Sequence, residues 1–199
     1  MEPKLSVRDR IYQAALERIK HYGYAKTTMA EIAADTGMSP GNIYRFFEAK
    51  IDIAEAIARA HYAAQQARLS AIARKRDVPA DERLRNVLMT QMRENYAMLS
   101  SDPKILELAE VVHTERPLLA SEENAHERVF LTQIIRDGAE AGLFSVENAD
   151  VAAEMLQVAT MKFRYPQLFS SLTLPRLERE LNGVMDMILK GIYSHAAVN

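Results

Sequence analysis

The chain has 199 residues, of which 48% are hydrophobic and 26% are charged, and its formal net charge is −2. This length allows one large domain or two small ones, each with an apolar core. The absence of cysteine excludes disulfides, thiolate zinc sites and cysteine nucleophiles, and it is typical of a reducing compartment.

The sequence predicts an all-α, cytoplasmic protein. It has only 7 Gly and 7 Pro, and it is rich in Ala, Leu, Glu and Arg, which lose little side-chain freedom in a helix. No apolar run approaches the roughly 20 residues that span a bilayer, and the N-terminal MEPKLSVRDR lacks the apolar core of a signal peptide. Residues 1–50 hold 8 Lys and Arg against 6 Asp and Glu, so the first quarter is the more basic part of an acidic chain.

The first predicted helix begins at a capping pair and ends at a glycine. The Ser6 hydroxyl can accept from free backbone N–H groups, and Asp9, three residues later, can return a hydrogen bond. Gly23 then stops the helix.

Two further short helices follow, separated by a tight turn. A capping-box pattern at Thr28 and Glu31 starts the second helix, and Gly37 ends it. The pair Ser39-Pro40 starts the third, with Ser39 as the cap and Pro40 at the first helical position. This arrangement is a helix-turn-helix candidate, and an ordinary helical corner in a bundle is the alternative.

Longer helices fill the rest of the chain, for a total of about nine. In the helix after Pro79, polar Gln91 and Asn95 interrupt the apolar face. The predicted segments are residues 51–76, a helix after Pro79, one from Asp102-Pro103 to His113, one from Pro117 to Gly142, and residues 148–165 and 174–194.

The last two predicted helices are apolar on more than one side, so each must bury two faces. Either both lie at the centre of the monomer, or one stripe packs against a second copy. Because a terminal helix is seldom central, we favour a homodimer with two-fold symmetry. The candidate interface residues are Val151, Met155, Val158, Leu181, Met185, Ile188 and Ile192.

The start of the third helix has the side chains expected of a reader of double-stranded DNA. Gly41 lets the backbone approach a duplex, Asn42 can pair with a base edge, and Arg45 can fork onto guanine or a phosphate. Tyr44 suits a phosphate or a thymine methyl group. Tyr44 and Phe46 could alternatively be core aromatics.

Apolar spacing orients this helix. Ile43 and Phe47 lie four residues apart, which places both on one helical face. We expect this pair to point inward and to hold the helix against its neighbours.

The segment TTMAEIAADTGMSPGNIYRFFEAK resembles the DNA-binding segment of the TetR (TetR/AcrR) family of bacterial repressors, and the resemblance extends over roughly residues 6–52. It implies phosphate contacts from Thr28, Tyr44 and Lys50, with residues 39–46 facing the groove. The matching positions are Thr27, Thr28, Ile32, Ala33, Gly37, Ser39, Gly41, Tyr44, Phe47 and Lys50. The candidate DNA contacts are Thr27, Thr28, Ser39, Pro40, Gly41, Asn42, Tyr44, Arg45, Phe46 and Lys50.

Two positions depart from the family pattern. Ala49 stands where a small capping residue usually precedes Lys50, so the fourth helix is expected to start differently. Phe46 stands where His or Tyr is frequent, which removes a polar contact to the DNA backbone.

For the rest of the chain, the resemblance implies a DNA-binding domain at residues 1–50 and an effector-binding and dimerisation domain at 51–199. The expected effector is a small apolar or amphipathic organic molecule, since methionine adapts to irregular ligands. Ordinary core packing is the alternative for every candidate. These candidates are Met89, Met92, Tyr96, His113, Phe130, Ile134, Met161 and Phe163.

No enzymatic motif supports a catalytic role. The chain has no Gly-rich phosphate loop, no G-x-S-x-G and no H-E-x-x-H, and its five histidines lack metal-ligand spacing. We therefore expect no cofactor, no metal and no enzyme activity. The expected function is a ligand-responsive repressor that binds a palindromic operator as a homodimer. The alternatives are an architectural or cell-division DNA-binding factor without an effector, and a helical binding module whose helix-turn-helix is incidental.

Overall fold

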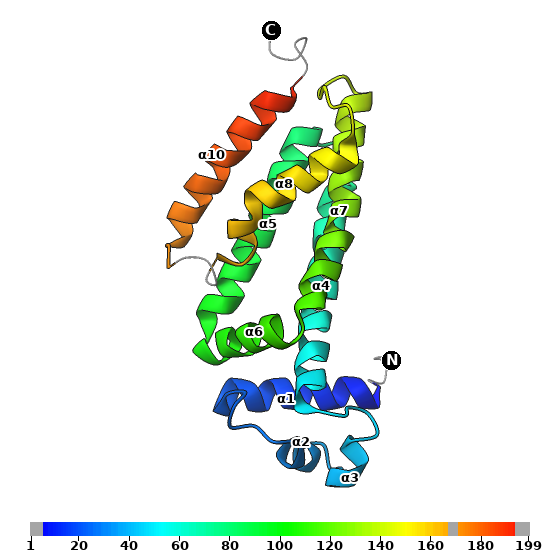
Figure 1. The fold of residues 1–199 in the computed structure, drawn as a ribbon, viewed down its shortest axis with the longest axis vertical. Helices are drawn as coiled ribbons and strands as arrows, with labels where there is room; N and C mark the ends of the chain where they lie inside the picture. The colour runs from blue at the N-terminus through cyan, green and yellow to red at the C-terminus, as the bar shows by residue number, and fades with distance from the viewer. Residues whose placement is uncertain (1–5, 167–170, 194–199) are drawn as a thin grey trace. The chain divides into compact units, whose positions relative to one another are not determined.

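The computed structural model describes residues 6–166 and 171–193, and the fold in these segments is all-α, as predicted. Figure 1 shows the helices in chain order. Over the described ranges they are α1 (Val7–Tyr22), α2 (Met29–Asp35), α3 (Pro40–Ile43), α4 (Lys50–Ala73), α5 (Ala80–Ser101), α6 (Pro103–Glu115), α7 (Pro117–Glu140), α8 (Ala149–Arg164) and α10 (Leu174–Ile192). In these residues, none of the helices is long and apolar enough to cross a bilayer.

The chain forms two compact units that do not follow the sequence order. The head unit consists of Met1–Ala63 and Met98–Ala120, and the C-terminal unit consists of Ala64–Ala97 and Ser121–Asn199. The head unit therefore includes α6 as well as the helix-turn-helix. The functional boundary predicted after residue 50 remains a prediction.

Local capping starts α1 and α2 at the predicted residues. The Ser6 hydroxyl accepts from the Asp9 amide at 3.1 Å, and the Asp9 carboxylate accepts from the Ser6 amide at 3.1 Å. The same reciprocal pair forms between Thr28 and Glu31. Both capping boxes satisfy backbone N–H groups that the first helical turn leaves unpaired.

The turn between α2 and α3 requires one glycine. Gly37 has φ of 68°, in the left-handed region that favours glycine. Pro40 occupies the first turn of α3 as predicted, and Ser39 is its N-cap residue, although the Ser39 side chain makes no capping hydrogen bond. The α-helical part of α3 is only four residues long.

The core of the head unit is apolar and draws on α1, α2, α3, the start of α4 and α6. Figure 1 shows α2 and α3 on one side of α1. The largest fully buried side chains of this core are Ile11, Ile19, Ile32, Ile43, Phe47 and Ile53.

Helix α6 is fastened to the α1–α2 turn within the head unit. The Lys104 ammonium donates to the backbone carbonyl of Lys20 at 3.1 Å and to that of His21 at 2.5 Å, at the carboxyl end of α1. The Glu107 carboxylate accepts from the Ala25 amide at 3.0 Å. These contacts neutralise the free carbonyls at the end of α1 and fix the start of the helix-turn-helix.

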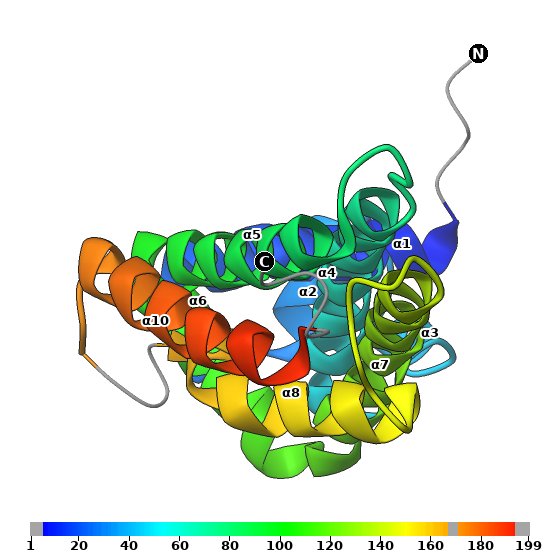
Figure 2. The same cartoon turned by 90° about the horizontal axis from the view of Figure 1, so that it is seen from above.

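The C-terminal unit packs α5, α7, α8 and α10 around a second core. Helices α8 and α10 lie side by side, as both views show (Figures 1 and 2). Its fully buried side chains include Leu69, Leu84, Met92, Leu131, Ile134 and Ile135. Arg83, which is 4% exposed, donates to the Ala73 carbonyl at 2.9 Å and to the Asp137 carboxylate at 2.8 Å, so it ties the end of α4 to α5 and α7.

Candidate functional site

The outer surface of α3 and of the turn after it, residues 44–46, gathers most of the side chains predicted to contact DNA. Ser39, Pro40, Gly41 and Arg45 are exposed, and Tyr44 is 52% exposed. An exposed arginine and an exposed tyrosine hydroxyl beside a bare backbone form a surface that can donate hydrogen bonds to phosphates and base edges.

Asn42 and the inward pair complete this helix. Asn42 is half-buried. Ile43 is 0% exposed and Phe47 is 2% exposed, which confirms that these two anchor the helix in the head core. Phe46 is half-buried and packs against the same core, so the alternative of a core aromatic fits this residue better than a base contact.

Nothing inside the molecule requires glycine at position 41. A Cβ atom added there would meet no other atom within 4 Å, and Gly41 is not among the glycines with positive φ. Glycine in a helix costs stability relative to alanine. The protein's own packing therefore does not explain the glycine at this position.

Arg8 holds the end of the α3 segment, and the sequence patterns did not reveal this role. Its guanidinium donates to the Phe46 carbonyl at 2.8 Å, and its Cζ lies 4.2 Å from the centroid of the Phe47 ring. The two contacts fix the carbonyl and the ring that follow the exposed surface. Because 38 residues separate the partners, no local pattern could have predicted the pairing.

Thr27 was predicted to contact DNA, and its burial argues against a contact by the side chain. Thr27 is 1% exposed, and its hydroxyl donates to the Gly23 carbonyl at 2.8 Å. The side chain therefore holds the α1–α2 turn together.

Lys50 was predicted to bind a phosphate, but the structure uses its ammonium inside the head. The ammonium donates to the backbone carbonyls of Tyr24 at 2.7 Å and Thr27 at 2.9 Å, and it lies 4.1 Å from the centroid of the Tyr24 ring. Burial lowers the pKa of this ammonium. Lys50 thus joins α4 to the turn before α2 and positions the helix-turn-helix.

Thr28 and Lys26 are exposed beside this turn. The Thr28 hydroxyl donates to the Glu31 carboxylate at 2.8 Å, and its hydrogen bonds to Glu31 lower the pKa of that carboxyl group. Lys26 was absent from the predicted contacts, although a cation directly before a helix start is a signal that the sequence contains. Its positive charge lies two residues before Thr28, the N-cap of α2.

Helix α4 begins at Lys50 despite the missing cap side chain at Ala49. The Ala49 amide donates to the Asp52 carboxylate at 2.9 Å, which supplies the reciprocal half of a capping box. Arg116, at the end of α6, donates to Asp52 at 2.7 Å and to Glu55 at 2.9 Å. The guanidinium, whose pKa these carboxylates raise, links α6 to the first turn of α4.

The predicted effector residues fall into different places. His113 is exposed and belongs to the head unit, whereas the other seven belong to the C-terminal unit. Four are buried in the C-terminal core, and Tyr96 and Phe130 pack against that core. These four are Met89, Met92, Ile134 and Phe163. Met161 is half-buried.

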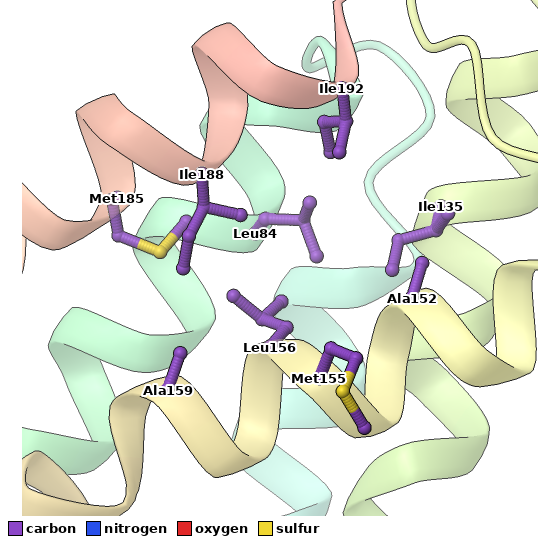
Figure 3. Close-up of a pocket in the computed structure, with 9 residues that line it drawn as sticks. All are labelled: Leu84, Ile135, Ala152, Met155, Leu156, Ala159, Met185, Ile188 and Ile192. Atoms are coloured by element: carbon purple, nitrogen blue, oxygen red, sulfur yellow. The ribbon is translucent and has the colours of Figure 1, made fainter.

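An apolar pocket of about 230 Å³ lies elsewhere in the C-terminal unit, among α5, α7, α8 and α10 (Figure 3). None of the predicted effector residues lines it. Its nine lining residues carry only carbon and sulfur in their side chains, and Figure 3 shows them arranged around a common space. They are Leu84, Ile135, Ala152, Met155, Leu156, Ala159, Met185, Ile188 and Ile192.

The C-terminal unit also buries a polar layer formed by Gln65, Gln91, Asn95, Glu127 and Arg164. Glu127 and Arg164 are 2% and 8% exposed and form an ion pair, and Gln91 donates to Glu127 at 3.1 Å. Asn95 donates to the Arg164 carbonyl at 2.6 Å and accepts from Gln65 at 2.8 Å. Gln91 and Asn95 are the residues that interrupt the apolar face in the sequence.

The predicted dimer residues divide between surface and interior. Val151, Met155 and Val158 are 51%, 52% and 63% exposed and form one stripe on α8. In α10, Leu181 and Met185 are 1% and 0% exposed, so their burial argues against direct contact with a second copy.

The remaining α10 candidates, Ile188 and Ile192, are half-buried and line the pocket. Met187, which is 69% exposed, was not predicted, because its position lies off the regular apolar stripe. An exposed methionine of this size makes Met187 a better interface candidate than the buried residues of the same helix.

Metal-ligand geometry does not appear in the described part of the chain. No group of three His, Cys, Asp or Glu side chains there could hold a metal ion.

Two sequence-family models match the chain. Residues 11–57 match the family described as "Bacterial regulatory proteins, tetR family", and residues 80–185 match "Tetracyclin repressor-like, C-terminal domain". The first match contains the helix-turn-helix, and the second contains most of the C-terminal unit. No curated protein matches the chain in sequence.

Solved structures with the same fold include several regulators. A TetR-family transcriptional regulator from Mesorhizobium loti is 17% identical, with a TM-score of 0.70 and coverage of 94% of this chain and 96% of the other. A transcriptional regulator from Cytophaga hutchinsonii is 24% identical, with a TM-score of 0.68 and coverage of 92% and 97%.

A third similar structure is SmeT, the repressor of the Stenotrophomonas maltophilia multidrug efflux pump SmeDEF. It is 20% identical, with a TM-score of 0.66 and coverage of 96% of this chain and 93% of that one. SmeT has also been solved as a complex with triclosan. At these identities the likeness establishes the fold.

Proposed function

The chain belongs to the TetR family of bacterial regulatory proteins, and from this premise we propose that it is a ligand-responsive repressor that binds a palindromic operator as a homodimer. Each subunit offers one α3 surface to the major groove, and a small organic effector releases the protein from DNA. Family membership supports a regulator without enzyme activity.

The observation that carries the proposal is the exposed surface of α3 around Gly41. Tyr44 and Arg45 are exposed in the turn directly after α3, Gly41 leaves the helix backbone bare, and Ile43 and Phe47 anchor the segment in the head core. A helix buried on one side and open on the other fits the major groove.

The phosphate contacts are assigned to Thr28, Tyr44 and Lys26. Lys50 and Thr27 are reassigned to positioning the head, because their polar atoms pair with backbone carbonyls. Salt-sensitive binding is expected, since neutralising phosphates releases counterions.

Two-fold symmetry would present two α3 helices to half-sites on the order of 34 Å apart. The exposed apolar stripe Val151, Met155 and Val158, together with Met187, supports a dimer through α8 and α10. A surface of this kind is costly to leave in water and is typical of an interface.

An effector would bind the DNA-free conformation more tightly than the DNA-bound one, because coupling between two sites is reciprocal. The apolar pocket of about 230 Å³ supports a ligand-responsive protein over an architectural or cell-division factor, for which a closed interior would be expected. The complex of SmeT with triclosan supports the same choice, because SmeT has this fold and was solved with a small ligand.

The DNA proposal is tested by selecting binding sites from a random duplex library and measuring affinity for the selected sites. Arg45→Ala should lose about 1–3 kcal/mol of binding free energy, unequally across sequences, if Arg45 reads a base. Arg179→Ala, an exposed arginine in α10, is the matched control and should leave the affinity unchanged. Failure of the wild type to select any sequence would refute the proposal.

The dimer proposal is tested by sedimentation. Val158→Glu places a charge in the proposed interface and should yield monomers, whereas Val129→Glu, at an α7 position that is 72% exposed, should leave the dimer intact. A dimer that survives Val158→Glu would place the interface on another face.

A further inference from the structure

The pocket among α5, α7, α8 and α10 contains no polar side chain. Its lining comes from helices that are far apart in sequence, with Leu84 from α5 and Ile135 from α7, both nearly or fully buried. A charged group placed inside the pocket, away from the exposed lining residues Met155 and Ala159, would lose its hydration without gaining a partner. The pocket therefore selects for uncharged molecules.

Two alanines account for the space. Ala152 and Ala159 stand seven residues apart on one side of α8, and Leu156 between them is buried. The facing α10 residues, Ile188 and Ile192, are only half-buried, so they do not close the gap. Larger residues at the two alanine positions would fill the pocket, which makes its existence a property of this sequence.

The volume sets the size of the ligand. An engineered apolar protein cavity of about 150 Å³ stays dry and binds benzene. The pocket of about 230 Å³ is larger by about half, which corresponds to about nine carbon atoms at the same packing. Met155 and Met185 in the lining can adjust to the outline of such a molecule.

We propose that this pocket is the effector site and that its ligand is a small, uncharged, hydrocarbon-rich molecule of roughly nine or ten carbon atoms. This inference rests on the proposed function, since an effector presupposes a DNA-binding regulator. The polar layer of Glu127 and Arg164 is not proposed as the ligand site, because its side chains bond to one another within the protein.

The inference is tested with two probes that share a carbon skeleton but differ in charge. Butylbenzene and phenylbutyrate are titrated into the full-length protein in a calorimeter, and the affinity for a selected operator is measured with and without each probe. The variants are Ala152→Leu, which fills the pocket, and Ala67→Leu, the same change at an exposed position on α4.

Butylbenzene should bind the wild type and Ala67→Leu and weaken operator binding about tenfold, whereas phenylbutyrate should do neither. Ala152→Leu should keep its DNA affinity and lose at least about tenfold in butylbenzene affinity, because the added methyl groups occupy the ligand's volume. This combination would support the inference.

Three results would overturn it while leaving the DNA-binding proposal intact. They are no binding of butylbenzene, equal binding by wild type and Ala152→Leu, and equal binding of the charged probe. If side chains of a second subunit fill the pocket in the dimer, butylbenzene will not bind. Loss of all DNA binding in the wild type would instead refute the proposed function, and the calorimetric comparison would still decide whether the pocket takes the probe.

Discussion

The head unit and the C-terminal unit differ in the polar side chains that they bury. The head core is made of aliphatic and aromatic side chains. Ser6 and Thr28 cap helix starts, and Lys50 donates to backbone carbonyls of the α1–α2 turn. The C-terminal unit buries the ion pair of Glu127 and Arg164 among neutral amides.

The difference predicts where a single substitution of a polar residue costs most stability. A buried ion pair rarely stabilises a fold more than apolar residues of the same volume would, because both charges lose their hydration. Removing one member is nevertheless costly. The C-terminal unit therefore depends on this buried pair in addition to its apolar core, whereas the head depends on packing and on hydrogen bonds to its backbone.

The largest expected effect tests the ion pair. Arg164→Met should lower the free energy of unfolding by about 3–5 kcal/mol, because it leaves the Glu127 carboxylate buried without its cation. The matched control is Arg136→Met, which breaks an exposed pair with Asp150 and should cost at most about 1 kcal/mol. Urea denaturation measures both.

A double variant sharpens this test. Replacing Glu127 with Leu in the Arg164→Met background should recover most of the loss, because no unpaired charge then remains. If Arg164→Met costs no more stability than Arg136→Met, the C-terminal unit does not depend on its buried ion pair.

The next effect concerns the head. Lys50→Met keeps the length of the side chain but removes the hydrogen bonds to the carbonyls of Tyr24 and Thr27, so we expect a loss of about 1–2 kcal/mol of stability. The dependence of DNA affinity on salt should stay the same. A salt slope reduced by about one would instead assign Lys50 to a phosphate.

Two glycines of the helix-turn-helix provide a matched pair. Gly37→Ala should destabilise the protein by about 1 kcal/mol, because its φ of 68° disfavours a side chain. Gly41→Ala should leave stability unchanged or slightly raised and should weaken DNA binding. Equal operator affinity for Gly41→Ala and wild type would show that DNA does not approach the backbone at Gly41 closely.

The smallest effect lies at the end of α10. The Tyr193 hydroxyl donates to the Asp81 carboxylate at 2.7 Å, and burial, together with this carboxylate, raises the pKa of Tyr193 to about 12. Tyr193→Phe should therefore cost about 1 kcal/mol of stability at neutral pH.

The pH dependence of that difference follows from the raised pKa. The folded protein keeps a proton that the unfolded chain gives up near the ordinary value of 10.0, so the contribution is complete below that pH and is lost as the pH rises through about 12. The difference in urea midpoint between the wild type and Tyr193→Phe should be smaller at pH 11 than at pH 9. A constant difference would show that the hydroxyl does not titrate as the contact implies.

The sequence located the helices of the head because their signals are local. Capping pairs such as Ser6 with Asp9 lie three residues apart, and Gly37 and Pro40 mark the turn directly. The family resemblance identified the outward face of α3, and the exposure of Tyr44 and Arg45 agrees with it.

The same reasoning did not predict the intramolecular contacts of Thr27 and Lys50, because a motif gives a position but not the direction of a side chain. Both residues lie where the family pattern has them, yet their polar atoms turn to backbone carbonyls of the α1–α2 turn. The role of Arg8 was not predicted because its partner, the Phe46 carbonyl, is 38 residues away in the sequence.

The sequence by itself determined the helical fold and the helix-turn-helix, and it predicted the surface proposed to meet DNA, since all three depend on spacing within a few residues. Only the tertiary structure decided which polar residues are buried together, such as Gln91 with Glu127, and where α8 and α10 leave a pocket. Those features depend on contacts between helices far apart in the chain. Two alanines on one helix create a space only because the facing isoleucines do not reach across it.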